Sequence, residues 1–214
     1  WWYAERRHLL ARSVAGMPPG RALDIGAAGG GNSRVLAAAA WSVMALEYGA
    51  EGAQVGKERG LDVLRADATA LPIATDSLDL VVAYDVLEHI PDHDAAVRDV
   101  RRVLGPDGTF LIAVPCDPKL WSAHDVAVDH VRRYTKTTLT DLLVRNGFQI
   151  TDLWSWNVLL RPTVQLRRRT STGSDLEELP RIVNAGLRAI VTVERYLPVK
   201  RLPGVTLMVT ARPA

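Results

Sequence analysis

The fold is decided by the stretch Ala22-Leu23-Asp24-Ile25-Gly26-Ala27-Ala28-Gly29-Gly30-Gly31-Asn32, in which a short apolar run leads through an acidic residue into a glycine-rich loop. Glycine suits such a loop because it adopts unusual backbone dihedral angles and lets the backbone approach a ligand closely. The N–H groups of a helix that follows the loop point toward an anionic group. The stretch therefore predicts a strand, a loop and a helix beneath a bound nucleotide-like cofactor.

The same loop does not fit the G-x-G-x-x-G pattern that binds nicotinamide dinucleotides. Counted from Gly26, the second required glycine is Ala28, and counted from Gly29, the third is Arg34. Both registers fail, so the sequence argues against a dinucleotide-binding enzyme of that kind.

Composition limits the class of protein. At 214 residues and 48% hydrophobic, the chain can bury a sizeable core and fits one domain with an elaboration. A net charge of +2 gives no reason to expect a polyanionic partner. Cys116 is the only cysteine, which excludes an internal disulfide and suits a reducing compartment, so we expect a cytoplasmic protein. No apolar run approaches the ~20 residues of a membrane span. The chain begins at Trp1 rather than at a methionine, so we expect further residues upstream.

Short apolar runs alternate with longer helical patterns from residue 22 to about residue 154, which predicts repeated β-α units and a parallel sheet. The expected strands are 22–25, 42–47, 62–66, 78–83, 109–114 and 149–154, and the expected helices are 33–40, 51–59, 92–104 and 137–146. A last strand over 205–211 alternates poorly between polar and apolar residues, so we expect it to be buried on both faces.

The opening stretch resembles motif I of the class I S-adenosylmethionine-dependent methyltransferases, acidic-x-G-x-G-x-G, through Asp24, Gly26 and Gly30, with Ala28 in place of the middle glycine. Later segments up to residue 115 resemble the successive motifs of the same family in order: Glu47-Tyr48, Arg65-Ala66-Asp67-Ala68, Tyr84-Asp85-Val86-Leu87-Glu88-His89 and Leu104-Gly105-Pro106-Asp107-Gly108. The chain is thereby identified as similar to the type 11/12 small-molecule methyltransferases. The resemblance implies an α/β fold with a doubly wound, seven-stranded Rossmann-like sheet of order 3-2-1-4-5-7-6 and an antiparallel last strand. It also implies a single domain over 1–214, with an N-terminal arm (1–20) and a helical insertion before the last strand (155–204).

The cofactor that the resemblance implies is S-adenosylmethionine, released as S-adenosylhomocysteine. Glu47 would accept hydrogen bonds from the ribose hydroxyls, Tyr48 would pack on the adenine, and Asp67 would accept from the adenine amino group. Alternative roles stay open, because Asp67 could cap a turn, Glu47 could be a solvated strand end and Tyr48 could serve packing alone. Asp24 would fix the backbone of the loop. The full expected cofactor set is Arg7, Asp24, Gly26, Ala27, Gly30, Glu47, Tyr48, Asp67, Ala68 and Asp85.

Methyl transfer to an oxygen requires that the acceptor hydroxyl lose its proton. A nearby base can take the proton, or a metal ion can lower the pKa of the hydroxyl. The candidate bases are His89, His124 and His130. The last two follow the fifth strand, and loops at the carboxyl ends of parallel strands line the ligand crevice. Our first choice is His124, oriented by Asp125. In the opposing interpretation His130 is a structural turn residue, and Arg132 and Arg133 form a solvated face.

Asp85, Glu88 and His89 lie at i, i+3 and i+4, so they would share one face if a helix began there. Ubiquinone O-methyltransferases and small-RNA end methyltransferases carry a similar segment that holds a divalent ion. Metal-free relatives carry it too, with the side chains capping a helix or bordering the acceptor pocket. We therefore predict no metal and keep these three residues as the alternative metal site.

The opening Trp1-Trp2-Tyr3-Ala4-Glu5-Arg6-Arg7-His8 resembles a subset of these methyltransferases from glycan, lipid-linked and secondary-metabolite pathways. An arm there could close over the cofactor, with Arg7 pairing the methionine carboxylate. A helix that packs its tryptophans on the sheet is the equally weighted alternative, and both could hold.

The insertion before the last strand is basic, since residues from 150 onward include ten Lys or Arg and five Asp or Glu. It contains Arg167-Arg168-Arg169 and an expected helix over 179–197, with arginines at 181, 188 and 195. Apolar positions follow helical spacing at Ile182, Gly186, Ile190, Val193 and Leu197. The insertion is either an amphipathic cap over the pocket or a lid that meets a membrane surface or a long acyl or prenyl acceptor.

The sequence thus predicts an enzyme of small-molecule biosynthesis that methylates a hydroxyl of a sugar, a lipid-linked glycoside or a secondary metabolite. The rivals are a carbon methyltransferase acting on a quinone-like ring and a protein that binds S-adenosylmethionine without catalysis. A nucleic-acid partner is not expected, because Tyr84-Asp85-Val86-Leu87 stands where a base-flipping Pro-Pro-Tyr/Trp-like segment would follow the fourth strand. We expect a cytoplasmic location, with peripheral membrane contact as an option, and the sequence leaves the oligomeric state open.

Overall fold

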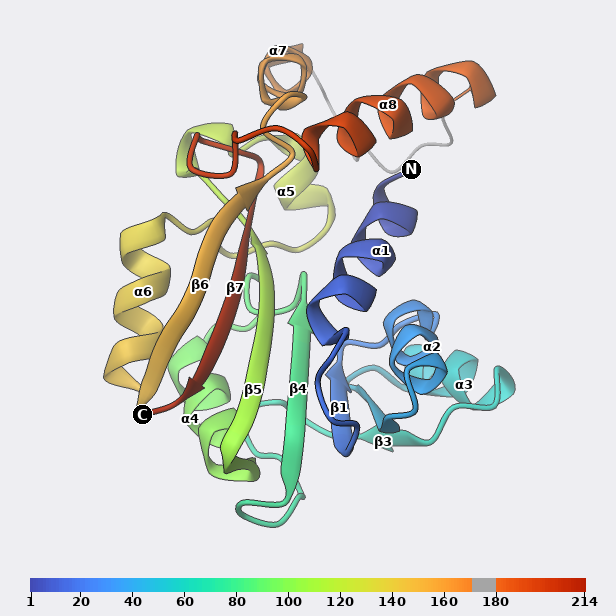
Figure 1. The fold of residues 1–214 in the computed structure, drawn as a ribbon, viewed down its shortest axis with the longest axis vertical. Coiled ribbons are helices and arrows are strands. Elements are labelled where there is room, and N and C mark those ends of the chain that lie inside the picture. The colour runs from blue at the N-terminus through green and yellow to red at the C-terminus, as the bar shows by residue number, and fades with distance from the viewer. Residues whose placement is uncertain (171–179) are drawn as a thin grey trace.

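The computed structural model describes residues 1–170 and 180–214, and for Arg169 and Thr170 only the backbone. Its strands are β1 (Arg21–Ile25), β2 (Ser42–Glu47), β3 (Val63–Arg65), β4 (Leu78–Tyr84), β5 (Leu104–Pro115), β6 (Phe148–Trp156) and β7 (Thr206–Pro213). They form a sheet of order β3-β2-β1-β4-β5-β7-β6, in which β7 runs antiparallel to both of its neighbours (Figure 1). The predicted fold class and strand order are confirmed.

The helices are α1 (Trp2–Val14), α2 (Gly31–Ala38), α3 (Ala50–Glu58), α4 (His93–Val103), α5 (Ala123–Ala127), α6 (Lys136–Arg145), α7 (Arg161–Thr170) and α8 (Arg181–Glu194), with a short 3-10 turn over Pro118–Leu120. Figure 1 shows α4 and α6 on one side of the sheet, α1 and α2 on the other, and α7 and α8 at one end. None of the helices in the described part of the chain combines the length and the apolar character needed to cross a membrane.

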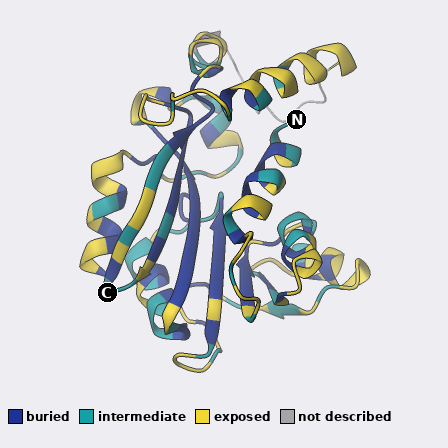
Figure 2. Ribbon diagram, in the orientation of Figure 1, coloured by how far each residue is buried: buried dark blue, intermediate teal, exposed yellow. Residues whose placement is uncertain are grey.

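Apolar residues of the central strands alternate between two cores, one on each face of the sheet. Leu23, Val81 and Phe110 belong to the core under α4 and α6, whereas their neighbours Ala22, Leu80 and Leu111 belong to the core under α1 and α2. Figure 2 shows these central strands as mostly buried. A strand that is buried on both faces reads as a continuous apolar run, which is why β4, β5 and β7 lack polar alternation.

Several predicted elements differ from the structure at their ends or were missed. The strand expected over 109–114 begins at Leu104, because Leu104 already pairs with Leu78 before the irregular stretch around Gly105 and Gly108. The short α5 and the arginine-rich α7 were not predicted as helices, since neither carries an apolar period long enough to recognise. The expected start of the 179–197 helix, Leu179, lies outside the described residues, and α8 ends at Glu194.

Candidate cofactor and acceptor site

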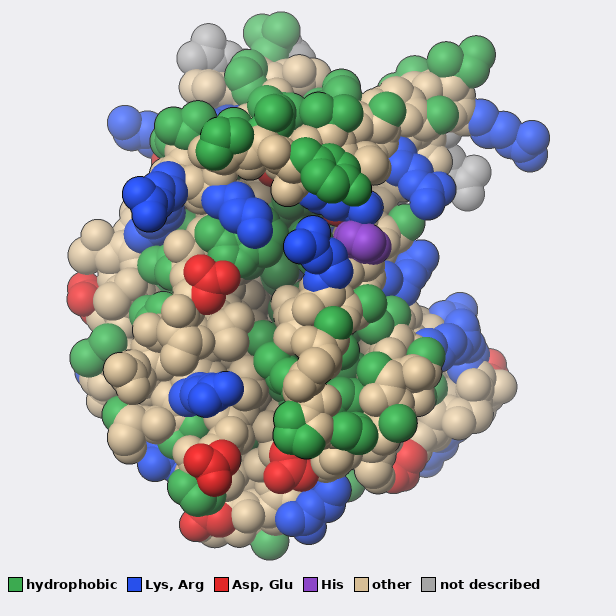
Figure 3. Space-filling model, viewed as in Figure 1, with side chains coloured by type: hydrophobic (Ala, Val, Ile, Leu, Met, Phe, Trp, Pro, Cys, Tyr) green, Lys and Arg blue, Asp and Glu red, His purple; other side chains and the backbone are tan. Residues whose placement is uncertain are grey.

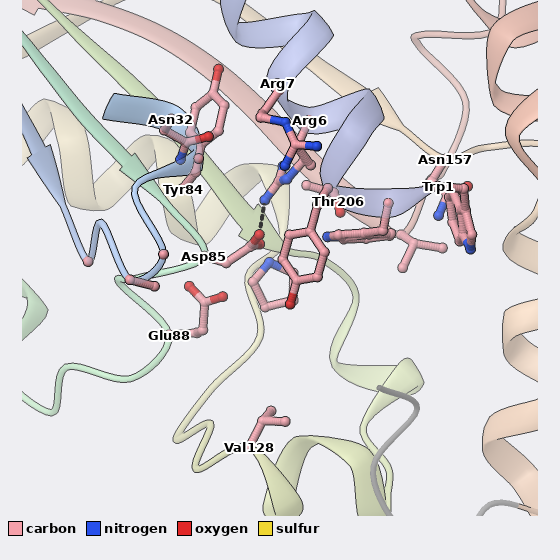
Figure 4. Close-up of a pocket in the computed structure, with 18 of the residues that line it drawn as sticks. Trp1, Arg6, Arg7, Asn32, Tyr84, Asp85, Glu88, Val128, Asn157 and Thr206 are labelled. Atoms are coloured by element: carbon pink, nitrogen blue, oxygen red, sulfur yellow. Dashed lines mark ion pairs between the residues drawn. The ribbon is translucent and has the colours of Figure 1, made fainter. Parts of the chain in front are cut away.

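A cavity of about 1140 Å³ opens at the carboxyl ends of β1 and β4, bounded by the glycine loop, α1, α5, α7 and α8 (Figure 4). It exceeds the roughly 300–1,000 Å³ typical of a pocket for one small molecule, so it has room for a cofactor and an acceptor together. Of the site residues predicted from sequence, those that line it are Arg7, Gly26, Ala27, Asp85, Glu88, His89, His124 and His130.

The glycine loop requires glycine at Gly26 and at Gly30. Both have positive φ, +67° and +72°, in the left-handed region that disfavours a side chain. A Cβ at Gly26 would lie 2.8 Å from Cγ2 of Val86, and a Cβ at Gly30 would lie 2.5 Å from Cδ1 of Leu61. A side chain at either position would therefore clash with its neighbours, and Gly26 also exposes its backbone to the cavity.

Ala28 occupies a left-handed position, φ +46°, where the family motif has its middle glycine. An alanine there costs on the order of 1 kcal/mol. Its N–H donates to Oε1 of Glu47, at the end of β2, so the Glu47 carboxylate is tied to the loop. Glu47 is half-buried at the end of its strand, so a solvated strand end and a tie to the loop both hold.

Asp24 lies completely buried beneath the loop. Its Oδ2 accepts a hydrogen bond from the Ser33 hydroxyl at 2.6 Å, so the carboxyl group anchors the first turn of α2 directly after the glycine loop. Burial raises the pKa of Asp24 to about 6, against the lowering effect of the hydrogen bonds from Ser33.

The residues expected around adenine lie outside the cavity wall. Tyr48 is largely exposed, Ala68 packs into the core, and neither they nor Asp67 line the cavity. Oδ1 of Asp67 accepts hydrogen bonds from the Thr69 backbone N–H and hydroxyl, both at 2.8 Å. The turn-capping role of Asp67 is thus present in the structure.

Helix α1 supplies an arginine that the sequence interpretation missed. Arg6 is buried, forms an ion pair with Asp85, and its guanidinium carbon lies 5.1 to 5.6 Å from the ring centroids of Trp2, Tyr84 and Trp156 (Figure 4). Its neighbour Arg7 is exposed and lines the cavity. Trp2 and Arg6 stand at i and i+4, as do Tyr3 and Arg7, so the spacing alone could not tell which arginine faces inward.

Three histidines of the cavity wall lie close together. The ring centroid of His130 lies 4.7 Å from that of His89 and 6.2 Å from that of His124. Oδ1 of Asp125 is 2.9 Å from Nδ1 of His130, so Asp125 orients His130 and the predicted pairing with His124 is wrong. The cause is local: Asp129 has a φ of +57°, which ends α5 and turns the chain so that the N–H of His130 donates to the carbonyl of Asp125.

Asp125 is held from several sides. Its Oδ1 accepts from Nε of Arg133 at 2.7 Å, and its Oδ2 accepts from the backbone N–H of Ser122 at 2.9 Å. Burial alone would raise the pKa of Asp125, but the hydrogen bond from His130 and the charge of Arg133 lower it. The pattern Ser122-Ala123-His124-Asp125 is a capping-box signal that could have revealed α5.

Arg132 and Arg133 do not form a solvated face. Arg133 is buried and also donates to the carbonyl of Cys116, at 3.1 Å. Arg132 donates to backbone carbonyls of the β4–α4 connection, including those of Leu87 and Pro91. Both arginines therefore fasten the histidine-bearing segment to the end of the sheet.

Glu88 is completely buried, and neither carboxyl oxygen has a hydrogen-bond partner among the described residues. Burial, and then the charge of Asp85, raises its pKa well above the usual range. Oε1 of Glu88 lies 3.8 Å from Nε2 of His130. Burial also lowers the pKa of His89, with the charge of His130 adding to the effect. Burial therefore favours the neutral forms of Glu88 and His89, the two side chains beside His130.

The residues that could hold a metal ion in the structure differ from the predicted set of Asp85, Glu88 and His89. Glu88, His89 and His130 each offer a ligand atom within 4.8 Å of the others, whereas Asp85 pairs with Arg6. The shared helical face expected for Asp85, Glu88 and His89 does not form, because Asp85 has a φ of +57° and the segment is a turn. Two imidazoles and one carboxylate suit a divalent transition metal better than Mg²⁺.

Comparison with known proteins matches residues 23–112 to a family model described as a methyltransferase domain. The chain is 30% identical over 160 residues to a probable S-adenosylmethionine-dependent methyltransferase of Mycolicibacterium smegmatis, covering 71% of this chain and 61% of that protein. It is 31% identical over 129 residues to a demethylmenaquinone methyltransferase of Renibacterium salmoninarum, covering 59% of this chain and 54% of that protein. The chain thus spans less than two thirds of either relative.

A solved structure of phosphoethanolamine N-methyltransferase 2 from Haemonchus contortus, in complex with S-adenosyl-L-methionine, is similar over 98% of this chain and 52% of that chain, with a TM-score of 0.66 and 18% identity. The likeness shows the fold. Gly26, Gly29 and Gly31 line the cavity without side chains, which fits a cofactor held against the backbone of the loop. Residues 23–112 therefore form a methyltransferase domain, and the chain is similar to methyltransferases whose cofactor is S-adenosylmethionine.

Proposed function

We propose that this chain methylates a hydroxyl oxygen of a small molecule, such as a sugar, a lipid-linked glycoside or a secondary metabolite. The observation that carries the proposal is the Asp125–His130 pair, in which a buried carboxylate holds one nitrogen of a cavity-lining imidazole. S-adenosylmethionine, when bound, supplies the methyl group as an electrophile on a sulfonium. What the protein must add is alignment of the acceptor and removal of its proton.

The cofactor would be held by residues from the carboxyl ends of the first strands and from α1. Gly26, Ala27 and Gly30 allow close approach, and Glu47 would accept from the ribose hydroxyls in place of the Ala28 N–H that it binds now. Arg7, exposed at the cavity beside Gly31, would pair with the methionine carboxylate. Tyr48, Asp67 and Ala68 are proposed at the adenine end, and Asp85 near the cofactor through its contact with Arg6.

His130 is the proposed base. With Nδ1 engaged by Asp125, Nε2 is the nitrogen left to accept the hydroxyl proton, and the Asp125 carboxylate would stabilise the imidazolium that results. A positioned base of this kind contributes roughly 10²–10⁴-fold in rate. His124 and His89 line the same cavity and would orient the acceptor.

Several arginines of the described cavity wall already pair with carboxylates of the protein: Arg6 with Asp85, and Arg133 and Arg168 with Asp125. Arg7 is exposed at the cavity and is proposed for the methionine carboxylate of the cofactor, so a phosphate or carboxylate on the acceptor is left to the acceptor panel to test.

A second candidate is methylation of a carbon on a quinone-like ring, which the similarity to a demethylmenaquinone methyltransferase favours. An acidic ring carbon also needs only modest help from a base, so His130 would serve either reaction. A third candidate is binding of S-adenosylmethionine without catalysis.

The experiment uses purified protein, S-adenosylmethionine labelled with ¹³C in its methyl group, and a panel of sugar, sugar-phosphate, lipid-linked and quinol acceptors. Release of S-adenosylhomocysteine reports turnover, and the ¹³C chemical shift of the product separates an O-methyl from a C-methyl group. A C-methyl product would replace the proposal with the second candidate, and cofactor binding without turnover on the whole panel would favour the third.

A further inference from the structure

Helix α8 carries an apolar stripe that faces solvent. Ile182, Gly186, Ile190, Val193 and Leu197 follow helical spacing, and the four with side chains are all exposed, with Ile182 at 87% and Val193 at 53%. Figure 2 shows most of α8 as exposed, with burial toward its C-terminal end. An apolar stripe at this spacing ordinarily faces a core, so its exposure calls for a partner.

The stripe cannot be satisfied by a rotation of the helix, because the other side of α8 is already fixed. Val191 is buried, Oε2 of Glu194 accepts from the backbone N–H of Leu159 at 2.9 Å, and Nε of Arg195 donates to Glu5 of α1 at 2.6 Å. Leu187, on the same helix, lines the cavity. The structure therefore holds α8 with its stripe outward.

Among the described residues of this region, the exposed charges around the stripe are of one sign. Across residues 180–202, the exposed charged side chains are Arg181, Arg188, Lys200 and Arg201, while the single acid, Glu194, is buried. Tyr196, exposed at 81%, and Leu202 extend the apolar surface beyond the helix. Figure 3 shows hydrophobic side chains along the end of the molecule that carries α7 and α8, with Lys and Arg beside them.

We propose that this surface, α8 with residues 195–202, docks on an anionic lipid bilayer. Exposed apolar side chains would enter the boundary between headgroups and acyl chains, the arginines would meet anionic headgroups, and Tyr196 suits the interface. A second copy of the chain is disfavoured as the occupant, because it would bring the same positive charges to the contact. Docking would place the bilayer beside the cavity roof formed by α7 and α8, where a lipid-linked acceptor could enter. Only this last consequence rests on the proposed function.

The test is co-sedimentation of the purified chain, without acceptor or cofactor, with vesicles of phosphatidylcholine alone or mixed with phosphatidylglycerol. We expect binding to the mixed vesicles that falls at least tenfold in the variant Ile182→Asp/Val193→Asp. The variant Arg181→Ala/Arg188→Ala should lose roughly fivefold for each arginine on mixed vesicles only. Val144→Asp, at an exposed valine of α6, is the matched control and should bind as the unchanged protein does.

Two results would overturn the proposal. The first is equal vesicle binding by the unchanged protein and the Ile182→Asp/Val193→Asp variant, including binding by neither. The second is a concentration-dependent dimer in sedimentation velocity that the same substitutions disperse, since the stripe would then be a contact between copies. Calorimetric titration with S-adenosylmethionine reports on the proposed function separately, so failure of one proposal does not imply failure of the other.

Discussion

The Asp125 carboxylate lies 2.9 Å from Nδ1 of His130, and this pairing fixes the orientation of the His130 ring in the cavity wall. A ring held through Nδ1 presents Nε2 in one direction, which is the geometry that a general base needs. Arg133 and Ser122 hold the carboxylate in turn, so the pair is anchored to the end of the sheet.

Replacement of His130 by glutamine should lower kcat roughly 10²–10⁴-fold, because the hydroxyl would lose its base. Affinity for S-adenosylmethionine, measured by calorimetry, should stay within a few-fold. Asp125→Asn should lower kcat less, and His8→Gln, on α1 outside the cavity lining, should leave it unchanged. If a variant with both His124 and His130 replaced transferred methyl groups at an unchanged rate, the assignment of a histidine base would be wrong.

Substitutions of the two neighbouring arginines of α1 should have different effects, one on the free energy of unfolding and the other on S-adenosylmethionine binding. Arg6→Met should lower the free energy of unfolding by about 1–3 kcal/mol, since Asp85, 38% exposed, would lose its partner. Adding Asp85→Asn should restore part of that loss. Arg7→Met should weaken S-adenosylmethionine binding with little effect on unfolding. Urea titration and calorimetry measure the two quantities, and equal effects of both substitutions on unfolding would count against the assigned roles.

Ala28→Gly should raise the free energy of unfolding by up to about 1 kcal/mol, because glycine relieves the left-handed conformation at this position. The adjacent Ala27→Gly is the control: Ala27 has no positive φ and is buried, so glycine there should destabilise by about 0.5–1 kcal/mol. Denaturant unfolding of both variants checks the prediction. Destabilisation by glycine at both positions would show that Ala28 is not strained.

Asp24→Asn should stabilise the protein without cofactor in a pH-dependent way. Burial raises the pKa of Asp24 from 3.8 to about 6, so the folded state binds the proton more tightly than the unfolded state. The stabilising contribution of protonated Asp24 to the free energy of unfolding is therefore fully present below pH 3.8 and lost as the pH rises through 6. Above that the ionised carboxylate costs about 2–3 kcal/mol, which asparagine avoids. Unfolding at a series of pH values should show the advantage of the variant growing up to neutral pH, and an advantage independent of pH would refute the assignment.

The sequence was sufficient to predict a site residue where only one residue type fits the local backbone conformation and its neighbours. Gly26 and Gly30 were found because only glycine tolerates their backbone and their neighbours, and the sheet order followed from the family resemblance. Arg6 was missed because two adjacent arginines differ only in the direction that α1 gives them. The histidine pairing depended on the left-handed Asp129, a conformation that its residue type permits but does not demand.

The α8 stripe shows a different limit. Its spacing was evident in the sequence, but spacing alone does not say whether a stripe faces a core or solvent. The contacts of Glu194 with Leu159 and of Arg195 with Glu5, each far apart in the chain, decide that orientation. Such long-range contacts have no local signal.

The most direct test of the central claim is transfer of a ¹³C-labelled methyl group from S-adenosylmethionine to the acceptor panel, run in parallel with the unchanged protein and with His130→Gln. The account predicts an O-methyl product from the unchanged protein and at least a hundredfold less, or about 3 kcal/mol in the barrier, from the variant at saturating cofactor. Equal rates for the two proteins, or no binding of S-adenosylmethionine by either, would contradict it.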